Sequence, residues 1–281
     1  MPHSLTIAAA QMCSGVSVQK NLQEIAQFAT KAAASGVDYL LTPEMSVAFV
    51  EGSGSLHKIA QAYDDNEALD VCAGIARQNK IHLHIGSLAI ALDNGQFANR
   101  SVLFSPDGKI VDFYDKIHLF DAELGNSQSY RESAHYRGGE RAVLTKMAGI
   151  NLGMSICYDL RFASLYRQLA LAGAHIISAP AAFTVPTGTA HWQVLIRARA
   201  IETGCYIIAA AQGGAHENGR TTYGHSMIVD PWGKIIAQKK DYAPGLIMAK
   251  INTKEVKKAR MRLPALANRA MFSLSVNHNE V

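Results

Sequence analysis

Three reactive side chains of this sequence follow directly on predicted β-strands. Glu44 comes after the apolar run Val37–Thr42 and a proline, which ends a strand because it has no N–H to donate. Lys116 lies at the end of a predicted hairpin strand, and Cys157 follows the run Ile150–Ile156 and precedes a helical pattern. A rigid sheet can direct residues at its strand ends into one cleft, so these three are candidates for a common site.

The three residue types match what acyl transfer by a thiol requires. A cysteine nucleophile needs a base that accepts its proton, and a glutamate such as Glu44 can serve when burial raises its pKa. The tetrahedral intermediate needs a cation or N–H donors at its oxyanion, a role that Lys116 can fill. Cys157 lies at a predicted strand-to-helix turn, where helix N–H groups favour the thiolate.

Other interpretations of the reactive residues remain open at this stage. An isolated cysteine is usually a small buried apolar residue, and Cys13, Cys72 and Cys205 lack a polar cluster. A Cys–His hydrolase is possible because the chain has 11 histidines. His82 and His84 share one strand face, but no further set of metal ligands accompanies them, so a metallohydrolase has little support.

Apolar strand-like runs alternate with helical patterns along the chain. The helical patterns lie at 22–33, 163–171 and 189–203. Gly36 ends the first and Gly204 ends the last, as glycine commonly does after a helix. The predicted strands lie at 5–12, 37–42, 81–88, 101–104, 150–156, 175–179, 206–212, 226–230 and 246–251. This mixture predicts layered α/β architecture, with helices covering sheets, in a single domain over residues 1–281.

Local patterns add detail to the predicted elements. The turns Ser105–Gly108 and Asp230–Gly233 carry Pro followed by Gly and fit hairpin connections. Alternation of Leu152, Met154 and Ile156 predicts a half-buried strand before Cys157. The polar stretch from 118 to 139 has no periodicity, and loops of that length inside a compact domain are usually functional.

Composition bounds the class of protein. Of 281 residues 18% are charged, and the net charge of +4 is too small and dispersed to indicate a nucleic-acid partner. The densest basic stretch, Lys254–Arg262, is expected to be a solvated helix face or a subunit-contact helix. Four cysteines without a CxxC pair favour a reduced, cytoplasmic setting. No apolar run reaches the roughly 18 residues that span a bilayer, so no membrane partner is expected.

Several motifs, in order along nearly the whole chain, resemble the nitrilase superfamily of carbon–nitrogen hydrolases, whose hallmark is a Glu–Lys–Cys triad in that order. The motifs are Ala9–Gln11, Pro43–Glu44, Tyr114–Phe120, Cys157–Phe162, Tyr223–Met227 and Asp230–Gly233. Within the superfamily the chain is most similar to the deaminated glutathione amidase branch, next to the ω-amidases. The segments that carry this similarity are Pro180–Gly188, Ala190–Trp192, Arg197–Thr203 and Ala209–Gln212.

The resemblance implies an α-β-β-α sandwich that pairs sheet against sheet with a second subunit, as a homodimer or a higher homo-oligomer. The C-terminal segment, about residues 253–281, is then expected to extend to the subunit interface. Hydrolysis without a metal or an organic cofactor is also implied. By the same resemblance Glu44 is the general base, Lys116 stabilises the oxyanion and Cys157 is the nucleophile.

Five further site residues come from the resemblance. The backbone N–H of Tyr158 is the second oxyanion donor. Glu132, in the long polar loop, positions the leaving amine or the attacking water. The carboxylate-recognition positions fall on Arg161, Phe183 and Thr187, and a guanidinium can hold a carboxylate by two parallel hydrogen bonds.

The implied reaction converts the terminal carboxamide of a small carboxylate-bearing substrate into an acid and ammonia, with deaminated glutathione as the expected substrate. The alternatives are an ω-amidase acting on α-ketoglutaramate or α-ketosuccinamate, another amide or nitrile specificity, and a non-catalytic protein that kept the fold. Two departures from the family pattern stand out. Ala163-Ser164 replaces Pro-Glu and puts the turn after Cys157 in doubt. Gly138-Gly139, where Pro-Gly is commoner, is expected to loosen a lid or alter substrate choice.

Overall fold

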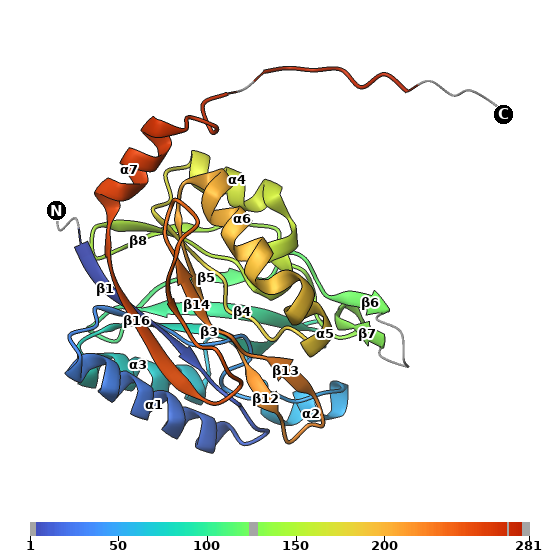
Figure 1. The fold of residues 1–281 in the computed structure, drawn as a ribbon. Coiled ribbons are helices and arrows are strands. Elements are labelled where there is room, and N and C mark those ends of the chain that lie inside the picture. Colours follow the sequence, from blue (N-terminus) through green and yellow to red (C-terminus); the bar gives the residue numbers. More distant parts are fainter. Residues whose placement is uncertain (1–3, 124–128, 269, 277–281) are drawn as a thin grey trace.

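The computed structural model describes residues 4–123, 129–268 and 270–276 and contains two six-stranded sheets that face each other (Figure 1). The first sheet has the strand order β16-β1-β2-β3-β4-β5. Its strands are β1 (Ser4–Gln11), β2 (Tyr39–Leu41), β3 (His82–Ala91), β4 (Phe97–Phe104), β5 (Ile110–Asp115) and β16 (Gly245–Asn252). β1, β2 and β3 are parallel, and the other neighbours are antiparallel.

The second sheet has the order β15-β14-β11-β10-β9-β8, with a parallel centre formed by β9, β10 and β11. Its strands are β8 (Leu144–Met147), β9 (Ile150–Gly153), β10 (Ile176–Ser178), β11 (Tyr206–Ala209), β14 (Met227–Val229) and β15 (Ile235–Gln238). Each sheet therefore has parallel central strands, whose carboxyl ends lie at the same edge and can position several side chains together.

Helices cover the outer face of each sheet (Figure 1). α1 (Val18–Ala34) and α3 (Glu67–Asn79) pack on the first sheet, and α4 (Ala163–Leu171) and α6 (Gln193–Thr203) lie on the second. α1 matches its predicted apolar face, since Leu22, Ile25 and Ala29 are buried at helical spacing. The chain therefore forms the predicted four-layer α-β-β-α sandwich.

The core between the sheets is built within one chain. Residues of both sheets meet there, among them Ile7 and Leu41 from the first and Ile176 and Ile207 from the second. The expectation that this sheet-to-sheet packing involves a second subunit is therefore wrong. Both faces of the central strands are covered, one by the other sheet and one by helices, so they are fully buried.

The same packing corrects the half-buried strand predicted before Cys157. Leu152, Met154 and Ile156 are all fully buried. β9 ends at Gly153, and the next three residues continue as irregular backbone toward the cysteine. Apolar alternation was misleading here because the other face of β9 packs on α4, against Leu169.

Shorter elements form the edge of the molecule near the strand ends. They are β6 (Asp121–Glu123), β7 (Ser129–Arg131), β12 (Gly213–Ala215), β13 (Thr221–Tyr223), α2 (Ser53–Ile59) and α5 (Val185–Thr187). β6 pairs with β7 and β12 pairs with β13, each as a small antiparallel hairpin. The stretch predicted as a long loop from 118 to 139 therefore contains the first hairpin, of which residues 124–128 lie outside the described part.

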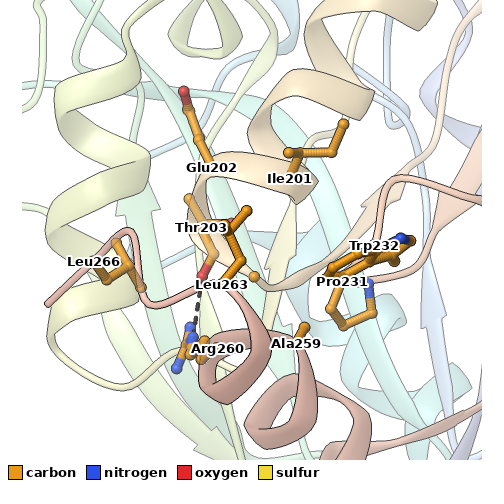
Figure 2. Close-up of a pocket in the computed structure, with 10 residues that line it drawn as sticks. Ile201, Glu202, Thr203, Pro231, Trp232, Ala259, Arg260, Leu263 and Leu266 are labelled. Carbon is orange, nitrogen blue, oxygen red and sulfur yellow. Dashed lines mark hydrogen bonds between the residues drawn. The ribbon is translucent and has the colours of Figure 1, made fainter. Parts of the chain in front are cut away.

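The C-terminal part begins with α7 (Thr253–Arg262), which packs on the body through Val256 and Ala259. Beyond it the chain leaves the body (Figure 1). A pocket lies between the end of α6, the turn at Pro231-Trp232 and α7 (Figure 2). Residues 269 and 277–281 of the predicted interface segment lie outside the described residues. Within the described ranges, no helix combines the length and the apolar character needed to cross a membrane.

Candidate active site

The structure brings the four predicted catalytic side chains to one cleft. Glu44 lies just beyond β2, Lys116 directly follows β5, and Cys157 lies beyond β9 from the opposite sheet. Glu132 follows β7, in the hairpin over the cleft. All four line the same cavity. Residues separated by up to 113 positions therefore meet because the ends of two facing sheets converge there.

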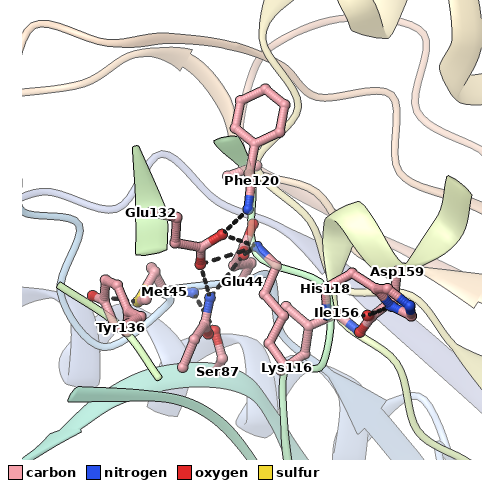
Figure 3. Close-up of polar contacts among 12 residues, drawn as sticks. Glu44, Met45, Ser87, Lys116, His118, Phe120, Glu132, Tyr136, Ile156 and Asp159 are labelled. Carbon is pink, nitrogen blue, oxygen red and sulfur yellow. Dashed lines mark hydrogen bonds and ion pairs between the residues drawn. The ribbon is translucent and has the colours of Figure 1, made fainter. Parts of the chain in front are cut away.

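A network of charge-assisted hydrogen bonds holds the centre of the cleft (Figure 3). The Lys116 Nζ donates to Glu44 Oε1 at 2.8 Å and to Glu132 Oε2 at 2.8 Å. The Nδ2 of Asn99, on β4, donates to the Oε1 atoms of both glutamates at 3.0 Å. The Phe120 N–H donates to Glu132 Oε2 at 2.6 Å. Lys116 and Glu44 are almost completely buried, so each charge is neutralised by a direct partner.

Sequence reasoning did not identify Asn99. A signal was present, because Asn99, Arg100 and Ser101 form a polar run inside an otherwise apolar strand. Each of the three is buried and bonded: Arg100 holds Asp115 by two parallel bonds of 2.7 and 2.8 Å. Asn99 faces the cleft, where it bridges the two carboxylates and fixes their separation.

The network sets the protonation of Lys116 and Glu44. Burial by itself lowers the pKa of Lys116, but the charges of Glu132 and Glu44 outweigh it and raise the pKa well above its ordinary value. Burial likewise favours the neutral form of Glu44, but Lys116 outweighs it and the pKa of Glu44 is lowered. The prediction that burial raises the pKa of this base is therefore wrong, because the cation lies within bonding distance.

The Cys157 thiol is protonated in the resting site. Burial raises its pKa well above the ordinary value, and the neighbouring Glu44 carboxylate raises it further, while Lys116 opposes them. The expected stabilisation of a thiolate by helix N–H groups does not prevail here. Sulfur must therefore lose its proton as it attacks, and Glu44 is the carboxylate whose charge acts on the thiol.

Cys157 adopts a left-handed backbone conformation, with φ of 48°. Such a conformation is unusual for a residue with a side chain, and it persists where the surroundings fix it. The Cys157 N–H donates to the Pro180 carbonyl at 2.8 Å. A one-turn helix then runs from Cys157 to Arg161, and the N–H groups of a first helical turn, including that of Tyr158, have no acceptor within the helix.

Asp159 clamps this turn from below and is fully buried. Its Oδ2 accepts bonds from the Ile156 N–H at 2.9 Å and the Tyr114 hydroxyl at 2.7 Å. Its Oδ1 accepts from the His118 N–H at 3.0 Å and lies 2.6 Å from that residue's Nδ1 (Figure 3). The turn is thus fixed by a carboxylate inside it, and α4 begins at Ala163 without the family's Pro-Glu pair.

A small pocket on one side of the sulfur gathers the predicted carboxylate-recognition residues. It is narrow, with a volume of about 20 Å³, and Arg161, Phe183 and Thr187 all line it together with Cys157. The Arg161 guanidinium carbon lies 5.3 Å from the centre of the Phe183 ring. Its Nη1 lies 3.2 Å from His191 Nδ1, while its Nε is buried without a hydrogen-bond partner.

The larger part of the cleft lies on the other side of the sulfur. Its volume is about 330 Å³, and it contains the charge network. Phe120, Cys157 and Ala182 line both chambers, so the thiol stands where they join. Tyr130 and Arg220 also line the large chamber, and sequence reasoning missed both.

Gly138-Gly139, which was expected to loosen a lid or alter substrate choice, lies in close contact with neighbouring backbone. A Cβ atom at Gly139 would lie 2.3 Å from the Asp115 carbonyl oxygen, and one at Gly138 would lie 3.0 Å from that of Ile117. The Gly139 N–H also donates to the Lys116 carbonyl at 2.8 Å. These glycines let the chain pack closely against the segment that carries Lys116.

His84 is engaged in the core. It is fully buried, with its ring nitrogens 2.6 Å from the Tyr39 hydroxyl and 2.7 Å from the Ser101 hydroxyl. Burial lowers the pKa of His84 to about 3, so the ring is neutral. Across the residues that the structure describes, no group of three or more His, Cys, Asp or Glu side chains is arranged to hold a metal ion.

Two glutamines in the motifs connect segments around the site, and one of them bonds the Glu44 backbone. The Gln212 Nε2 donates to the Glu44 carbonyl at 3.0 Å and to the Ser14 hydroxyl at 2.8 Å. Gln11 Oε1 accepts from the Ser226 N–H at 2.9 Å. These bonds tie the end of β1 and the segments around β11 and β14 to the site, and so account for several motifs that carry no reactive group.

The fold is the one expected of carbon–nitrogen hydrolases. Residues 6–261 match the family model described as carbon–nitrogen hydrolase, so the chain belongs to that family. It is a hydrolase that acts on amides and a member of the nitrilase superfamily, as the resemblance predicted.

Named relatives place the chain among amidases of this family. It is 40% identical over 272 residues to a deaminated glutathione amidase of Yersinia enterocolitica, covering 95% of this chain and 94% of that one. The C. elegans NitFhit protein superposes with a TM-score of 0.88 at 33% identity, covering 95% of this chain and 65% of that chain. A Glu-to-Gln variant of the amidase from Nesterenkonia sp. AN1 superposes with a TM-score of 0.78 at 26% identity, covering 92% and 98%. In that structure acrylamide has added to the active-site cysteine.

Proposed function

We propose that this protein is a deaminated glutathione amidase in which Cys157 is the nucleophile, Glu44 the general base and Lys116 the oxyanion cation. The observation that carries the proposal is the junction of two chambers at the thiol, one small with an arginine and one large with the acid–base groups. The 40% identity to a relative of that name supports the same choice.

Acylation begins from the protonated thiol. Glu44 takes the proton as Sγ of Cys157 forms a bond to the amide carbon, and the carbonyl electrons move to oxygen. The oxyanion faces Lys116 and the Tyr158 N–H. An ammonium has three donors, and in the free enzyme Lys116 donates to Glu44 Oε1 and to both oxygens of Glu132. The longest of these bonds, 3.1 Å to Glu132 Oε1, is the one that the oxyanion replaces. When the C–N bond breaks, protonated Glu44 returns its proton to the leaving nitrogen and a thioester remains.

Deacylation repeats the sequence with water. Glu44 accepts a proton from the water as oxygen attacks the thioester carbon, and the oxyanion forms in the same place. Collapse expels sulfur, which recovers its proton from Glu44. Glu132 holds Lys116 and faces the same chamber, where it orients the leaving amine and then the water.

The two chambers match the two ends of deaminated glutathione. Its keto-acid carboxylate fits beside Arg161, whose buried Nε lacks a partner, with Phe183 and Thr187 as walls. Its scissile nitrogen belongs to a cysteinylglycine unit, so the leaving group is that dipeptide. The expectation from the sequence that ammonia leaves is therefore wrong for this substrate. A chamber of about 330 Å³ beside Glu44 accommodates a dipeptide, whereas the ammonia of an ω-amide needs far less room.

The first test is the ratio of kcat/KM for deaminated glutathione to that for α-ketoglutaramate. We expect a preference for deaminated glutathione of at least about tenfold, because only this substrate fills the large chamber. Arg161→Met should lower kcat/KM for both substrates, since each presents the same keto acid. A wild-type preference for α-ketoglutaramate would show that the protein is an ω-amidase instead.

The protein is further proposed to act in the cytoplasm as a homodimer in which the C-terminal segment of each copy crosses to the other. The four free cysteines support a reducing compartment. Met271, Phe272 and Leu274 are at least 85% exposed on a segment that leaves the body (Figure 1). Apolar side chains displayed in this way are typical of an interface.

The pocket beside α7 is a receptor for such a segment. Ile201, Trp232 and Leu263 line it and are about half exposed (Figure 2). The Arg262 guanidinium carbon lies 4.3 Å from the centre of the Trp232 ring. Helix α7, which lines the pocket, and the segment that follows it lie at the same end of the molecule (Figure 1), so two copies related by a twofold axis can exchange their segments.

Light scattering after gel filtration tests the dimer. The wild-type protein is expected to elute as a dimer at micromolar concentration, and the double variant Met271→Ser/Phe272→Ser should dissociate at protein concentrations at least about tenfold higher. Met248→Ser removes an exposed methionine from β16 and serves as the control. A monomeric wild type, or dissociation equal to that of the control, would contradict the exchange.

A further inference from the structure

Three buried side-chain polar atoms in the described part of the chain have no hydrogen-bond partner, and all three belong to residues that line the two chambers. They are Asn99 Oδ1, Arg161 Nε and Arg220 Nε. Buried polar groups are nearly always bonded in folded proteins, so orphaned ones concentrated at one place indicate where a ligand supplies the partner. Asn99 and Arg161 already belong to the proposed machinery. Arg220 has no role in it.

The hairpin that carries Arg220 is built to hold it in place. Arg220 lies in the turn between β12 and β13, where its N–H donates to Asn218 Oδ1 at 3.0 Å. The Asn218 Nδ2 in turn donates to the Phe49 carbonyl at 3.1 Å. The guanidinium carbon lies 4.9 Å from the Phe49 ring centre and 5.1 Å from that of Tyr130. Two aromatic rings thus fix the plane of a cation in the wall of the large chamber.

The donors of Arg220 are not consumed by the protein. Its Nη2 reaches the Ala182 carbonyl at 3.5 Å, the limit of a hydrogen bond. Its Nε lies 3.4 Å from a Glu51 oxygen without the alignment of a hydrogen bond, and that carboxylate is half exposed. Arg100 is different: it is equally enclosed by rings but holds Asp115 by two bonds of 2.7 and 2.8 Å. Arg100 is satisfied, and Arg220 is available to an incoming anion.

We propose that Arg220 recognises a carboxylate on the leaving amine, and so makes the enzyme selective for amides of a peptide with a free C-terminus. The inference rests on the proposed function, because it assigns the large chamber to the leaving group. Arg161 then binds the carboxylate of the acyl part and Arg220 that of the departing part, with Cys157 between them. Glu51 is the exchangeable counter-ion of Arg220 in the free enzyme.

The test compares three substrates on two variants. The substrates are deaminated glutathione, its analogue with the glycine carboxylate converted to a carboxamide, and α-ketoglutaramate, which has no peptide. For the wild type, conversion to the carboxamide should lower kcat/KM roughly 10- to 100-fold. Arg220→Met should lower kcat/KM for deaminated glutathione by the same factor, abolish the discrimination between the two peptide substrates, and leave α-ketoglutaramate within about twofold of the wild type.

Arg131→Met is the matched control. Arg131 lines the same chamber, but its guanidinium is exposed and bonds Glu123 at 3.1 Å. Arg131→Met should keep the wild-type preference for deaminated glutathione over its carboxamide analogue. Three results would overturn the role of Arg220. Arg220→Met could still prefer deaminated glutathione over its carboxamide analogue, or could lose kcat/KM equally on all three substrates. Alternatively, Arg131→Met could be the variant that loses this preference. A wild-type preference for α-ketoglutaramate overturns only the proposed substrate, and no turnover of deaminated glutathione overturns both.

Discussion

Lys116→Met should destabilise the protein and stop catalysis together. Removal of the ammonium leaves the buried Glu44 and Glu132 carboxylates facing each other around Asn99, with no cation. Breaking a buried ion pair from one side costs about 3–5 kcal/mol of unfolding free energy. Loss of the oxyanion cation should lower kcat/KM about 10²- to 10³-fold. Thermal unfolding and amide hydrolysis measure the two effects, with Lys20→Met on the exposed side of α1 as the control.

The effect of Lys116→Met on stability should depend on pH in a defined direction. In the wild type the pKa of Glu44 is lowered by folding, so its contribution to stability is present at neutral pH and is lost as the pH falls. Without Lys116, burial dominates and raises the pKa of Glu44, so protonation relieves the repulsion. The difference in unfolding free energy between wild type and variant should therefore shrink as the pH is lowered. A constant difference would contradict the network.

A second substitution separates stability from chemistry. Lys116→Met/Glu132→Gln removes one of the opposed charges and should regain most of the lost stability. It should not regain activity, because the oxyanion still lacks its cation. Restored activity in the double variant would show that Lys116 acts only as a structural counter-ion.

Cys157→Ala should abolish turnover while leaving the fold in place. The side chain is small, and its backbone conformation is set by the Pro180 bond and by Asp159, which an alanine leaves intact. Removing a covalent nucleophile lowers kcat by at least about 10⁴-fold. Cys157→Ser should be nearly as inactive, since Glu44 is a weak base with a lowered pKa and a hydroxyl is less acidic than a thiol.

Cys13→Ala provides the matched comparison for that loss. Cys13 is partly exposed and lies at 3.7 Å from His216 Nδ1, outside both chambers. It should retain wild-type kcat/KM for deaminated glutathione. Circular dichroism and thermal unfolding should show that all three cysteine variants fold. Ammonia or dipeptide release by Cys157→Ala at the wild-type rate would rule out the thiol mechanism.

The sequence alone identified the chemistry of the site better than its electrostatics. Glu44, Lys116 and Cys157 each follow a strand, and strand ends of a layered α/β fold meet, so their convergence could be expected. Their protonation could not, since it depends on distances across the fold. Lys116 bonds a glutamate 72 positions away, and that one contact reverses the pKa shift expected from burial.

Other residues of the site could not be predicted from the sequence for the same reason, since their contacts depend on distances across the fold. Asp159 and Arg220 contact side chains on other segments of the chain, and a single polar residue near a turn does not reveal such partners in the sequence. In the case of α3 the signal was present and was overlooked: Leu69, Cys72 and Ala76 are buried at helical spacing behind an Asn66 cap. The sheet-to-sheet core needs the full topology, because an apolar strand does not reveal which layer covers each face.

The central claim is that amide cleavage proceeds through an acyl group on Cys157. Acid quenching during turnover of deaminated glutathione, followed by peptide mass spectrometry, tests it most directly. An α-ketoglutaryl thioester should appear on the peptide that contains Cys157, at a level that falls to zero once substrate is exhausted. The acyl group on another residue, or full turnover by Cys157→Ala with no adduct, would contradict the mechanism.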